Sequence, residues 1–553
     1  MIIRSMTNPT VAYFSLEMML ESDIPTYAGG LGVLAGDILR SCADLQIPAV
    51  GVSLVYSGDT FYQSVTPDGS QTFLKQDWQK LDQLTKLPDI IEITLADTQV
   101  KVGCWRYDIV GLTGFVVPVY LLDTNLTSNP GWIRDITKNL YATGDYRLMQ
   151  EILIGFGGIK MLSALGFISI PTYHLNEGHT ALVTLALLTE NNYQDAAVKK
   201  RCVFTTHTPI PEGHDKFPYD TAYRLAGNYL PWHIKKLTGE TDLSLSHLAL
   251  NLSRKSFAVS RKHRETSKKL FPAFDFDYIT NGIHHRSWTH NHLQDVYNQY
   301  LPGWLENPSL LANSYQLKTN DLWQAHTECK RKLVSYVNHH LLPDHPEFNE
   351  NTLTISLARR PVAYKRPLLL YHDLERLSRI GQGRLQIIQC GKSHPDDDVS
   401  QSFVRQIIEA SNAVKDKIKI CYLENYSPKI ARTLVSGSDV WLNTPTKPLE
   451  ASGTSGMKAA INGVLNFSIL DGWWIEGFAR NPQSGWAINP AATDNNDDAD
   501  ANSLYTILES EIIPAYYNRR DDWIRRMQAA ITLGAHFNSH RVVQEYQAKA
   551  WTP

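Results

Sequence analysis

The chain has 553 residues, more than one hydrophobic core usually supports, and therefore predicts two domains of about 250 residues each. A hydrophobic content of 43% with a net charge of −3 is typical of a soluble globular protein and gives no basic stripe for nucleic acid. The six cysteines are scattered, without a CxxC pair or a metal-ligand spacing. We therefore expect a reduced, cytoplasmic protein without a bound metal.

No stretch of the sequence predicts a leader peptide or a membrane span. Residues 1–17 contain no sustained apolar run, and the long apolar segment 152–170 is interrupted by Lys160 and by several glycines. We expect that segment to belong to a helix of about residues 145–165 that stops at Gly166 and is followed by a strand.

The first half of the chain begins with a strand, a glycine-rich loop, a helix and a second strand. The apolar runs are 11–16 and 49–55, the glycines lie in 27–37, and residues 34–45 have helical spacing. This is the βαβ pattern of a doubly wound domain, whose helix start can bind an anion. Taken alone, such a glycine loop is more often a structural turn.

Two later strands, 173–179 and 203–209, end in polar residues, as strands at the site edge of a doubly wound sheet do. Their histidines lack zinc spacing, so we expect no metal there. Between the βαβ unit and these strands, residues 60–125 alternate as in an antiparallel excursion with a turn at 67–69. Residues 245–270 are interpreted as helical and basic, with a solvated face.

A short strand within 277–284 lies near the midpoint of the chain, where we place the division into domains 1–283 and 284–553. In the second half, a strand at 353–357 runs into a segment with four cations in eight residues, Arg359, Arg360, Lys365 and Arg366. Such a cluster suits an anion with several oxygens, with a charged surface strip as the alternative.

Further strands are predicted at 386–390 and 418–423, and the acidic run 494–500 is predicted to be a solvated loop. Three helices, about 503–517, 521–533 and 539–550, end the chain. By analogy with doubly wound proteins, we expect the last helices to cross back to the first domain.

The most informative stretch is 439–477. A strand at 439–443 precedes a loop of small residues, 452–456, and a helix of about 457–462 that carries Lys458. Free amides at a helix start can cradle a phosphate. An amine beside that cradle can act as a point charge or form a Schiff base with pyridoxal phosphate, although a tight turn with a solvated lysine is the simpler alternative.

The string EASG at 450–453, followed by Met457-Lys458 and Asn462, closely resembles the pyridoxal-phosphate signature of the α-glucan phosphorylases, with Ile461 where the family usually has Leu or Met. Four more segments resemble phosphorylase motifs in the same order: YAGGLGVLAGD at 27–37, HLNEGHTAL at 174–182, TTHTPIPEGHDKF at 205–217 and ARRPVAYKR at 358–366. Glycogen and starch synthases share the glycine loop and the THTP motif but not EASGTSGMK.

The resemblance implies an α/β protein of two doubly wound, Rossmann-like domains facing each other across a cleft, the glycosyltransferase B-type fold. It implies retaining phosphorolysis of the terminal glucose of an α-1,4-glucan or maltodextrin by inorganic phosphate, giving α-D-glucose 1-phosphate. The cofactor would be pyridoxal 5'-phosphate. Nucleic acid and membranes are not expected as partners, and homo-oligomerisation is left open.

The resemblance also implies roles for individual residues. The catalytic residues would be Lys458, which forms the Schiff base, Arg360 and Lys365, which bind phosphate, and His207. The cofactor would be bound by Lys458, Gly453, Thr454, Ser455, Gly30 and Tyr426. Substrate would be bound by Gly29, Leu31, Asn176, Glu177, His179, His207, Asn281, Glu450 and Arg359. No metal ligand is implied.

Three departures from the family pattern qualify the resemblance. Glu177-Gly178 replaces the more common Asp-Thr, as in short prokaryotic-type members. The loop at 140–145 is shorter than the matching glucose-contacting loop, leaving Asp145 as the candidate for its role. No long segment precedes the first motif, so we expect no phosphorylation switch or allosteric control.

Two other functions stay open at this point. A nucleotide-sugar-dependent glucan synthase would share the glycine loop but would have no use for Lys458. A non-catalytic glucan-binding protein would have no use for the cations at 359–366.

Overall fold

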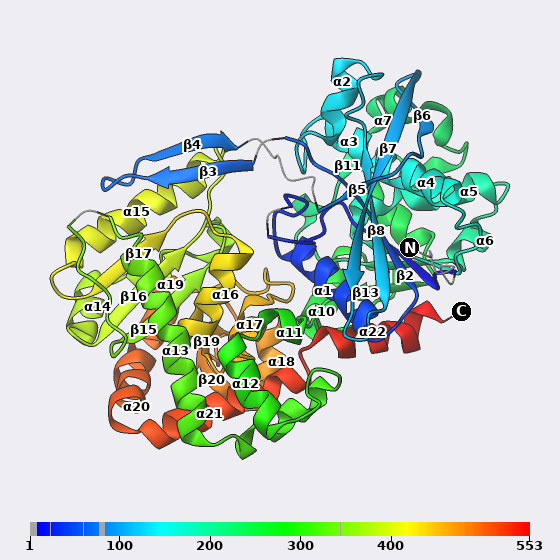
Figure 1. Ribbon diagram of the computed structural model, residues 1–553. Helices are drawn as coiled ribbons and strands as arrows, with labels where there is room; N and C mark the ends of the chain where they lie inside the picture. Colours follow the sequence, from blue (N-terminus) through cyan, green and yellow to red (C-terminus); the bar gives the residue numbers. More distant parts are fainter. Residues whose placement is uncertain (1–7, 23, 59, 77–82, 343, 553) are drawn as a thin grey trace. The chain divides into compact units, whose positions relative to one another are not determined.

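The computed structural model describes residues 8–22, 24–58, 60–76, 83–342 and 344–552, and the chain divides into two compact units (Figure 1). Unit 1 takes Met1–Thr60, Gln76–Asn281 and Ser539–Pro553, and unit 2 takes Phe61–Lys75 and Gly282–Asn538. The main division falls two residues before the predicted one. The sequence-based division did not separate 61–75 from unit 1, whereas the structure groups this segment with unit 2.

Unit 1 is built on one large sheet with the strand order β14-β13-β10-β9-β1-β2-β8-β7-β5, in which β6 also pairs with β7. From β14 to β8 every neighbouring pair is parallel, and β7 adds antiparallel pairs at the β8 edge. The strands are β1 Val11–Phe14, β2 Ala49–Leu54, β5 Thr85–Lys86, β6 Ile91–Leu95, β7 Thr98–Val110, β8 Val116–Asp123, β9 Thr172–Asn176, β10 Cys202–Thr205, β13 Lys255–Ala258 and β14 Asp277–Tyr278. The later part of the predicted antiparallel excursion, β5 to β8, therefore extends the main sheet, whereas β3 Thr60–Val65 and β4 Gln71–Gln76 form a separate two-stranded hairpin.

Apolar side chains cover both faces of this sheet. In β1, Ala12 and Phe14 belong to one core and Val11 and Tyr13 to the other, because successive residues of a strand point to opposite faces. The helices of unit 1 include α1 Gly30–Asp44, α3 Asp145–Ile152, α4 Gly158–Ala164, α5 Leu182–Glu190, α7 Tyr219–Ala226, α9 Leu245–Asn251, α10 Arg261–Leu270 and α22 Ser539–Tyr546. The C-terminal α22 lies beside α1 in the second core (Figure 1).

The prediction of a helical stretch over 245–270 was wrong in its middle. Strand β13 separates α9 from α10 and pairs with β10 and β14. Its Phe257 is fully buried, while Lys255 is exposed at the strand end. The basic residues on both sides have helical spacing, and they obscure a four-residue strand in which only Phe257 and Ala258 are apolar.

Unit 2 has a six-stranded, fully parallel sheet in the order β17-β16-β15-β18-β19-β20. The strands are β15 Leu353–Ala358, β16 Leu385–Cys390, β17 Lys419–Leu423, β18 Val440–Asn443, β19 Leu465–Ile469 and β20 Gly485–Ile488. Numbered along the chain, this is the 3-2-1-4-5-6 order of a Rossmann fold. The predicted fold class, doubly wound and Rossmann-like, is confirmed. The order reverses between β15 and β18, and ligands bind at the carboxyl ends of strands at such a point.

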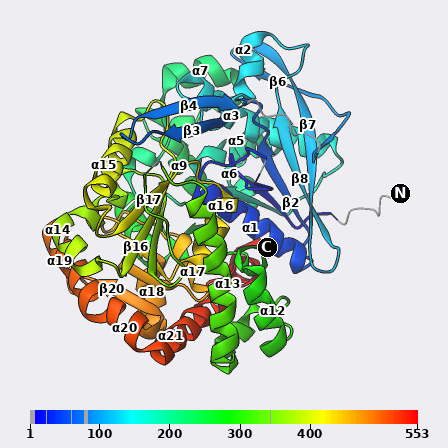
Figure 2. The ribbon, with the colours of Figure 1, turned by 60° about the vertical axis from the view of Figure 1, so that its left-hand side comes forward.

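The helices of unit 2 include α11 His285–Trp288, α12 Asn291–Tyr300, α13 Thr319–Asn338, α14 Leu374–Gly381, α15 Asp398–Val414, α16 Pro428–Gly437, α17 Ser455–Ala460, α18 Trp473–Arg480, α19 Asp497–Ile507, α20 Ile513–Asn518 and α21 Arg520–Thr532. Helices α13 and α16 lie side by side in both views (Figures 1 and 2). Among the described residues, no helix is long and apolar enough to cross a membrane.

The acidic run near 494–500 was predicted to be a solvated loop, and this prediction was wrong for its second half. Helix α19 begins at Asp497, capped by the side chain of Asn496, which accepts a hydrogen bond from the Ala499 amide. Acidic residues stabilise a helix N-terminus. Asp500 is buried, and both Asp497 and Asp500 pair with Arg366, at 2.8 and 2.7 Å.

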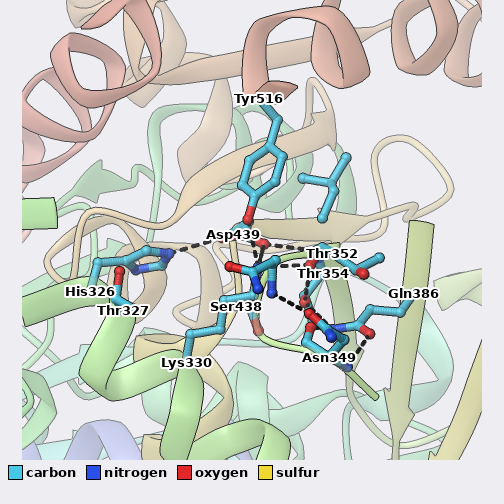
Figure 3. Close-up of polar contacts among 12 residues, drawn as sticks. His326, Thr327, Lys330, Asn349, Thr352, Thr354, Gln386, Ser438, Asp439 and Tyr516 are labelled. Carbon is cyan, nitrogen blue, oxygen red and sulfur yellow. Dashed lines mark hydrogen bonds and ion pairs between the residues drawn. The ribbon is translucent and has the colours of Figure 1, made fainter. Parts of the chain in front are cut away.

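A buried charge network fixes α13 and α20 to the amino ends of β15 and β18 (Figure 3). Asp439 accepts hydrogen bonds from His326 Nε2 at 2.9 Å, from the Thr354 amide at 2.7 Å and from Lys330 Nζ. Lys330 also donates to Tyr516 Oη at 2.8 Å. The network lies at the amino edge of the sheet, because Asp439 directly precedes β18. The network therefore stabilises the fold of unit 2.

Candidate active site

The glycine loop of unit 1 is held by a buried carboxylate. Glu17, three residues after β1, accepts hydrogen bonds at Oε2 from the amides of Ala28 and Gly29, at 2.7 and 2.9 Å. Its Oε1 accepts from Tyr141 Oη at 2.7 Å. The loop at the start of α1 is therefore fixed from behind.

The four glycines of this loop and helix differ in what surrounds them. A Cβ on Gly32 would come 2.7 Å from Tyr27 Cβ, and one on Gly36 would come 2.1 Å from the Met19 carbonyl oxygen, so close packing requires both glycines. A Cβ on Gly29 or Gly30 would meet no atom within 4 Å. Both residues are exposed. Protein packing does not explain these two glycines, whereas close approach of a ligand to the backbone would.

Tyr141 links the short loop at 140–145 to the glycine loop. The Arg147 guanidinium lies over its ring, 4.8 Å from the centroid. Arg147 in turn pairs with Glu151 at 3.1 Å and with Asp215 at 2.6 Å. Asp145, the residue considered for the role of the shortened loop, instead pairs with Arg224 at 2.8 Å on the surface.

The ends of β9 and β10 bring together the predicted sugar-site residues of unit 1. His207 Nε2 lies 2.7 Å from Asn176 Oδ1, which assigns the imidazole proton to Nε2. Asn176 Nδ2 donates to Ser15 Oγ at 3.1 Å. His179 Nε2 accepts from the Leu16 amide at 3.0 Å. The strand ends of β1, β9 and β10 are therefore joined by side chains.

Glu177 uses both carboxylate oxygens within the protein. Oε1 accepts from the Gly178 amide at 2.9 Å, and Oε2 accepts from the His207 amide and Thr208 Oγ1 at 2.7 and 2.9 Å. Burial raises the pKa of this carboxyl, but His214, His207 and the amide donors hold the pKa below its ordinary value. With φ of +83°, Glu177 holds a strained backbone that these bonds stabilise. Among the predicted site residues, Glu177 bonds directly to His207.

The two site histidines of unit 1 are neutral near pH 7. Burial lowers the pKa of His207 to about 4, against the opposing charge of Glu177. Burial also lowers the pKa of His179 to about 3, and Arg147 acts in the same direction. Neutral imidazoles suit hydrogen bonding to sugar hydroxyls. Asn281, at the end of the Gln76–Asn281 segment of unit 1, is buried, and its amide donates to the Val259 carbonyl at 3.1 Å.

In unit 2 the predicted cations lie after β15, at the topological switch point. Arg359 Nη2 donates to the Leu442 carbonyl at 3.1 Å and to Asn443 Oδ1, both at the end of β18. Arg360 is exposed. Lys365 forms an ion pair with Glu450, so the structure joins a predicted phosphate ligand and a predicted glucose ligand.

The small-residue loop after β18 packs on the turn before α18. The Trp473 amide donates to the Ser452 carbonyl at 2.9 Å, and the Glu450 amide donates to Asp471 Oδ2 at 2.9 Å. Burial raises the pKa of Asp471 to about 7. Gly453 has φ of +73°, which explains glycine at this position. Ser452 Oγ is buried and has no partner among the described residues.

Lys458 lies in α17 with its side chain buried. Its Nζ is 3.9 Å from the centroid of the Trp288 ring, at the end of α11. Asn462 Nδ2 donates to the carbonyls of Lys458 and Trp288, each at 2.8 Å, and so holds the two segments together. Ser455 Oγ accepts from the Trp441 indole at 3.1 Å. Thr454 is the N-cap residue of α17, and its carbonyl accepts from the Lys458 amide at 3.1 Å.

Tyr426 follows β17 near the same edge. Burial raises the pKa of its phenol, the Cys390 thiol adds to this, and Arg359 opposes it. The two residues before Tyr426 have another task. Glu424 Oε2 accepts from the Val65 amide and Asn425 Oδ1 from the Gln63 amide, both at 2.7 Å, so they hold strand β3 of the β3–β4 hairpin.

Four residues that contact the predicted site residues of unit 1 or unit 2 were not singled out from the sequence: Glu17, Tyr141, Trp288 and Asp471. Glu17 offered one signal, since it is an acidic residue directly after a buried strand. The other three are recognised only by their contacts with residues more than ten positions away.

The family model for carbohydrate phosphorylase matches residues 233–481. A maltodextrin phosphorylase of Thermococcus litoralis is 36% identical over 592 aligned residues, covering 98% of this chain and 70% of its own length. A glycogen phosphorylase of Aquifex aeolicus is 34% identical, covering 98% and 86% of the two chains. A glycogen phosphorylase of Mycobacterium tuberculosis is 34% identical, covering 98% and 71%.

Proposed function

The chain belongs to the carbohydrate phosphorylase family, and we propose that it is an α-1,4-glucan phosphorylase. The reaction would transfer the non-reducing terminal glucose of an α-1,4-glucan to inorganic phosphate, with retention, giving α-D-glucose 1-phosphate. The observation that carries this proposal is the buried Lys458, held by Asn462 against Trp288 behind a loop of small residues at the switch point of unit 2.

The residues around Lys458 suit pyridoxal 5'-phosphate. Ser452 Oγ is a buried hydroxyl whose hydrogen-bonding capacity is unused among the described residues. Gly453 and the start of α17 provide backbone amides, and the Lys458 amine would hold the aldehyde end of the cofactor. When bound, the cofactor would supply an ionisable phosphate group beside the reacting phosphate. Thr454, Ser455, Tyr426 and Gly30 are the further proposed cofactor contacts.

We propose that the cations of unit 2 bind inorganic phosphate. Arg360 is exposed and ready to contact an anion, and Lys365 would exchange its ion pair with Glu450 for phosphate when substrate binds. Glu450 would then be free to accept hydrogen bonds from glucose hydroxyls. The positive charge of Arg359 would strengthen the attraction for phosphate. Phosphate held in this way would donate a proton to the leaving glucan oxygen and then attack the sugar carbon.

We propose that the polar strand ends of unit 1 bind glucose. Neutral His207 and Asn176 offer directional hydrogen bonds, and Glu177 orients His207 through its amide. Gly29, Leu31, His179 and Asn281 complete the proposed contacts. We further propose that the protein acts in the cytoplasm, since its six cysteines are free and buried.

The proposal is tested by incubating the purified chain with maltodextrin, with and without inorganic phosphate. We expect glucose 1-phosphate to form only with phosphate, and Lys458→Ala to reduce the rate by at least about 1,000-fold, as loss of a cofactor anchor would. Release that is independent of phosphate would contradict the proposal. Glucan elongation from a sugar nucleotide, without phosphorolysis, would favour a synthase instead.

A further inference from the structure

Lys392 lies where the chain leaves the sheet of unit 2, beside the predicted phosphate ligands. It follows Gly391 at the carboxyl end of β16, and the register pairs Cys390 with Ala358 of β15. The Arg359 amide donates to the Cys390 carbonyl at 3.0 Å, and a Cβ on Gly391 would come 2.7 Å from the Arg359 carbonyl oxygen. The two chain segments therefore leave the sheet in contact with each other.

No acidic side chain neutralises Lys392 within the part of the chain that the structure describes. The nearby cations differ in this respect, since Lys365 pairs with Glu450 and Arg366 pairs with two aspartates. The Lys392 ammonium is partly buried and lies 4.5 Å from the centroid of the Phe61 ring. Burial lowers its pKa to about 8. A desolvated cation without an anion is costly, and a bound anion would remove that cost.

A second cation at this edge also has unused hydrogen-bonding capacity. Arg359 Nη2 is satisfied by the end of β18, but Nη1 is buried without a hydrogen-bond partner among the described residues. Burial lowers the pKa of the Arg359 guanidinium. An unsatisfied buried donor in a native structure calls for a missing partner, and for a guanidinium that partner is typically an oxyanion.

The ring over Lys392 is held in place by several contacts. Phe61 lies in the β3–β4 hairpin, Thr60–Val65 and Gln71–Gln76, which lies beside α15 in Figure 1. Gln63 Nε2 donates to Ser393 Oγ at 2.9 Å, next to Lys392. Phe61 packs edge-on against His394 at 5.4 Å between ring centroids. At the turn of the hairpin, Asn412 of α15 donates to the Pro67 carbonyl at 3.0 Å.

We propose that Lys392, together with Nη1 of Arg359, binds a phosphate dianion at the carboxyl edge of unit 2, and that Phe61 shields this ammonium from water. The ligand chemistry is orthophosphate or a phosphate monoester. This assignment rests on the proposed function, in which inorganic phosphate is the second substrate and the cofactor carries a phosphate ester. It adds a residue outside the ARRPVAYKR and EASGTSGMK motifs.

Competitive acylation of lysines in the full chain tests this assignment without any turnover. The amines are labelled with an acylating reagent at pH 8, and the label on Lys392 and on exposed Lys415 is measured by mass spectrometry. We expect inorganic phosphate to slow labelling of Lys392 several-fold and to leave Lys415 unchanged, relative to chloride at equal ionic strength. If phosphate does not protect Lys392 in the chain with or without pyridoxal phosphate, and pyridoxal phosphate does not protect it either, the assignment is wrong.

The two sources of phosphate are separated by the same labelling. Protection by inorganic phosphate in the cofactor-loaded chain assigns Lys392 to the substrate phosphate. Protection by pyridoxal phosphate alone, with no further effect of inorganic phosphate, assigns it to the cofactor phosphate. A chain that shows no phosphorolysis but a protected Lys392 would overturn the proposed function and keep this assignment. An active chain in which phosphate does not protect Lys392 would keep the proposed function and overturn this assignment.

Variants give a second readout. For a substrate-phosphate role, we expect Lys392→Met to raise the KM for phosphate about 10-fold to 100-fold, the effect of losing one charge-assisted hydrogen bond, with the KM for glucan unchanged. Lys415→Met, the matched control on the surface, should change neither constant. Equal rises in both KM values for Lys392→Met would contradict a phosphate-specific role.

Discussion

At the scale of single residues, the structure uses buried carboxylates to position groups that could contact a ligand. Glu17 holds the glycine loop by its amides, and Glu177 holds His207 by its amide. Both carboxylates accept several hydrogen bonds, which compensates for their burial. The exposed glycines and the neutral His207 are therefore the residues available to contact a ligand, and the two glutamates hold them in position.

Tyr141→Phe tests this support. The change removes the hydroxyl that donates to Glu17 Oε1 and leaves the ring under Arg147. A hydrogen bond to a charged group contributes about 1.5–3 kcal/mol, so we expect kcat/KM for the glucan to fall by about 10-fold or more. Steady-state kinetics with maltodextrin measures the effect.

The matched control is Tyr107→Phe, which breaks a tyrosine–glutamate hydrogen bond of the same length, 2.7 Å, to Glu21. This bond is exposed and does not touch the glycine loop. Tyr107→Phe should leave kcat/KM unchanged. Equal losses in the two variants would show that Tyr141 has no special role in positioning the loop.

The motif residues could be predicted from sequence because short-range strings carry them. Lys458, Glu450 and the cations after β15 lie within two such strings, and the sheet order places both at one edge. Trp288 under Lys458 could not be predicted, because it comes from α11, 170 positions earlier, and belongs to no such string. Side-chain contacts of this range depend on the packed fold.

At the scale of elements, long parallel strands were predictable and short or dependent elements were not. Strands such as β15 and β16 each have six consecutive buried residues, most of them apolar. Strand β13 has four residues between basic segments and was missed. The β3–β4 hairpin was predicted as part of an excursion, but its place in unit 2 depends on hydrogen bonds that its amides donate to Glu424 and Asn425, more than 350 positions away.

The Asp439 network gives an element-scale prediction. Asp439→Asn leaves Lys330 buried without its charge partner, and removing one partner of a buried pair costs about 3–5 kcal/mol of unfolding free energy. Chemical denaturation at pH 7 measures the loss. The control is Asp108→Asn, whose pair with Arg106 is largely exposed and should change stability by less than about 1 kcal/mol.

The same network predicts a pH dependence. Burial alone would raise the pKa of Asp439, but Lys330 and His326 hold it below its ordinary value. The stabilisation is therefore fully present above the pKa of an unfolded aspartate, about 3.9, and is lost as the pH falls through the folded pKa. The stability difference between wild type and Asp439→Asn should be constant above about pH 5 and shrink below pH 4. A difference that grows on acidification would contradict this account.

At the scale of the whole molecule, the chain combines two doubly wound units with different chemistry at their strand ends. Unit 1 presents glycine amides, an asparagine and neutral histidines, which suit sugar hydroxyls. Unit 2 presents cations and a buried lysine, which suit phosphate groups. The two units could be anticipated from chain length, from the βαβ pattern of the first half and from the strands of the second half. The return of the C-terminal segment 539–553 to unit 1 was expected by analogy, whereas the place of 61–75 in unit 2 could not be located from local patterns.

The central claim is that Lys458 anchors pyridoxal phosphate, and one measurement tests it most directly. The purified chain is reduced with borohydride and digested, and the modified peptide is sequenced beside that of Lys458→Ala. We predict an absorbance band of the bound cofactor that borohydride bleaches, and a pyridoxyl group on Lys458 alone. A chain that takes up no pyridoxal phosphate, or that carries the group on another lysine, would contradict the claim.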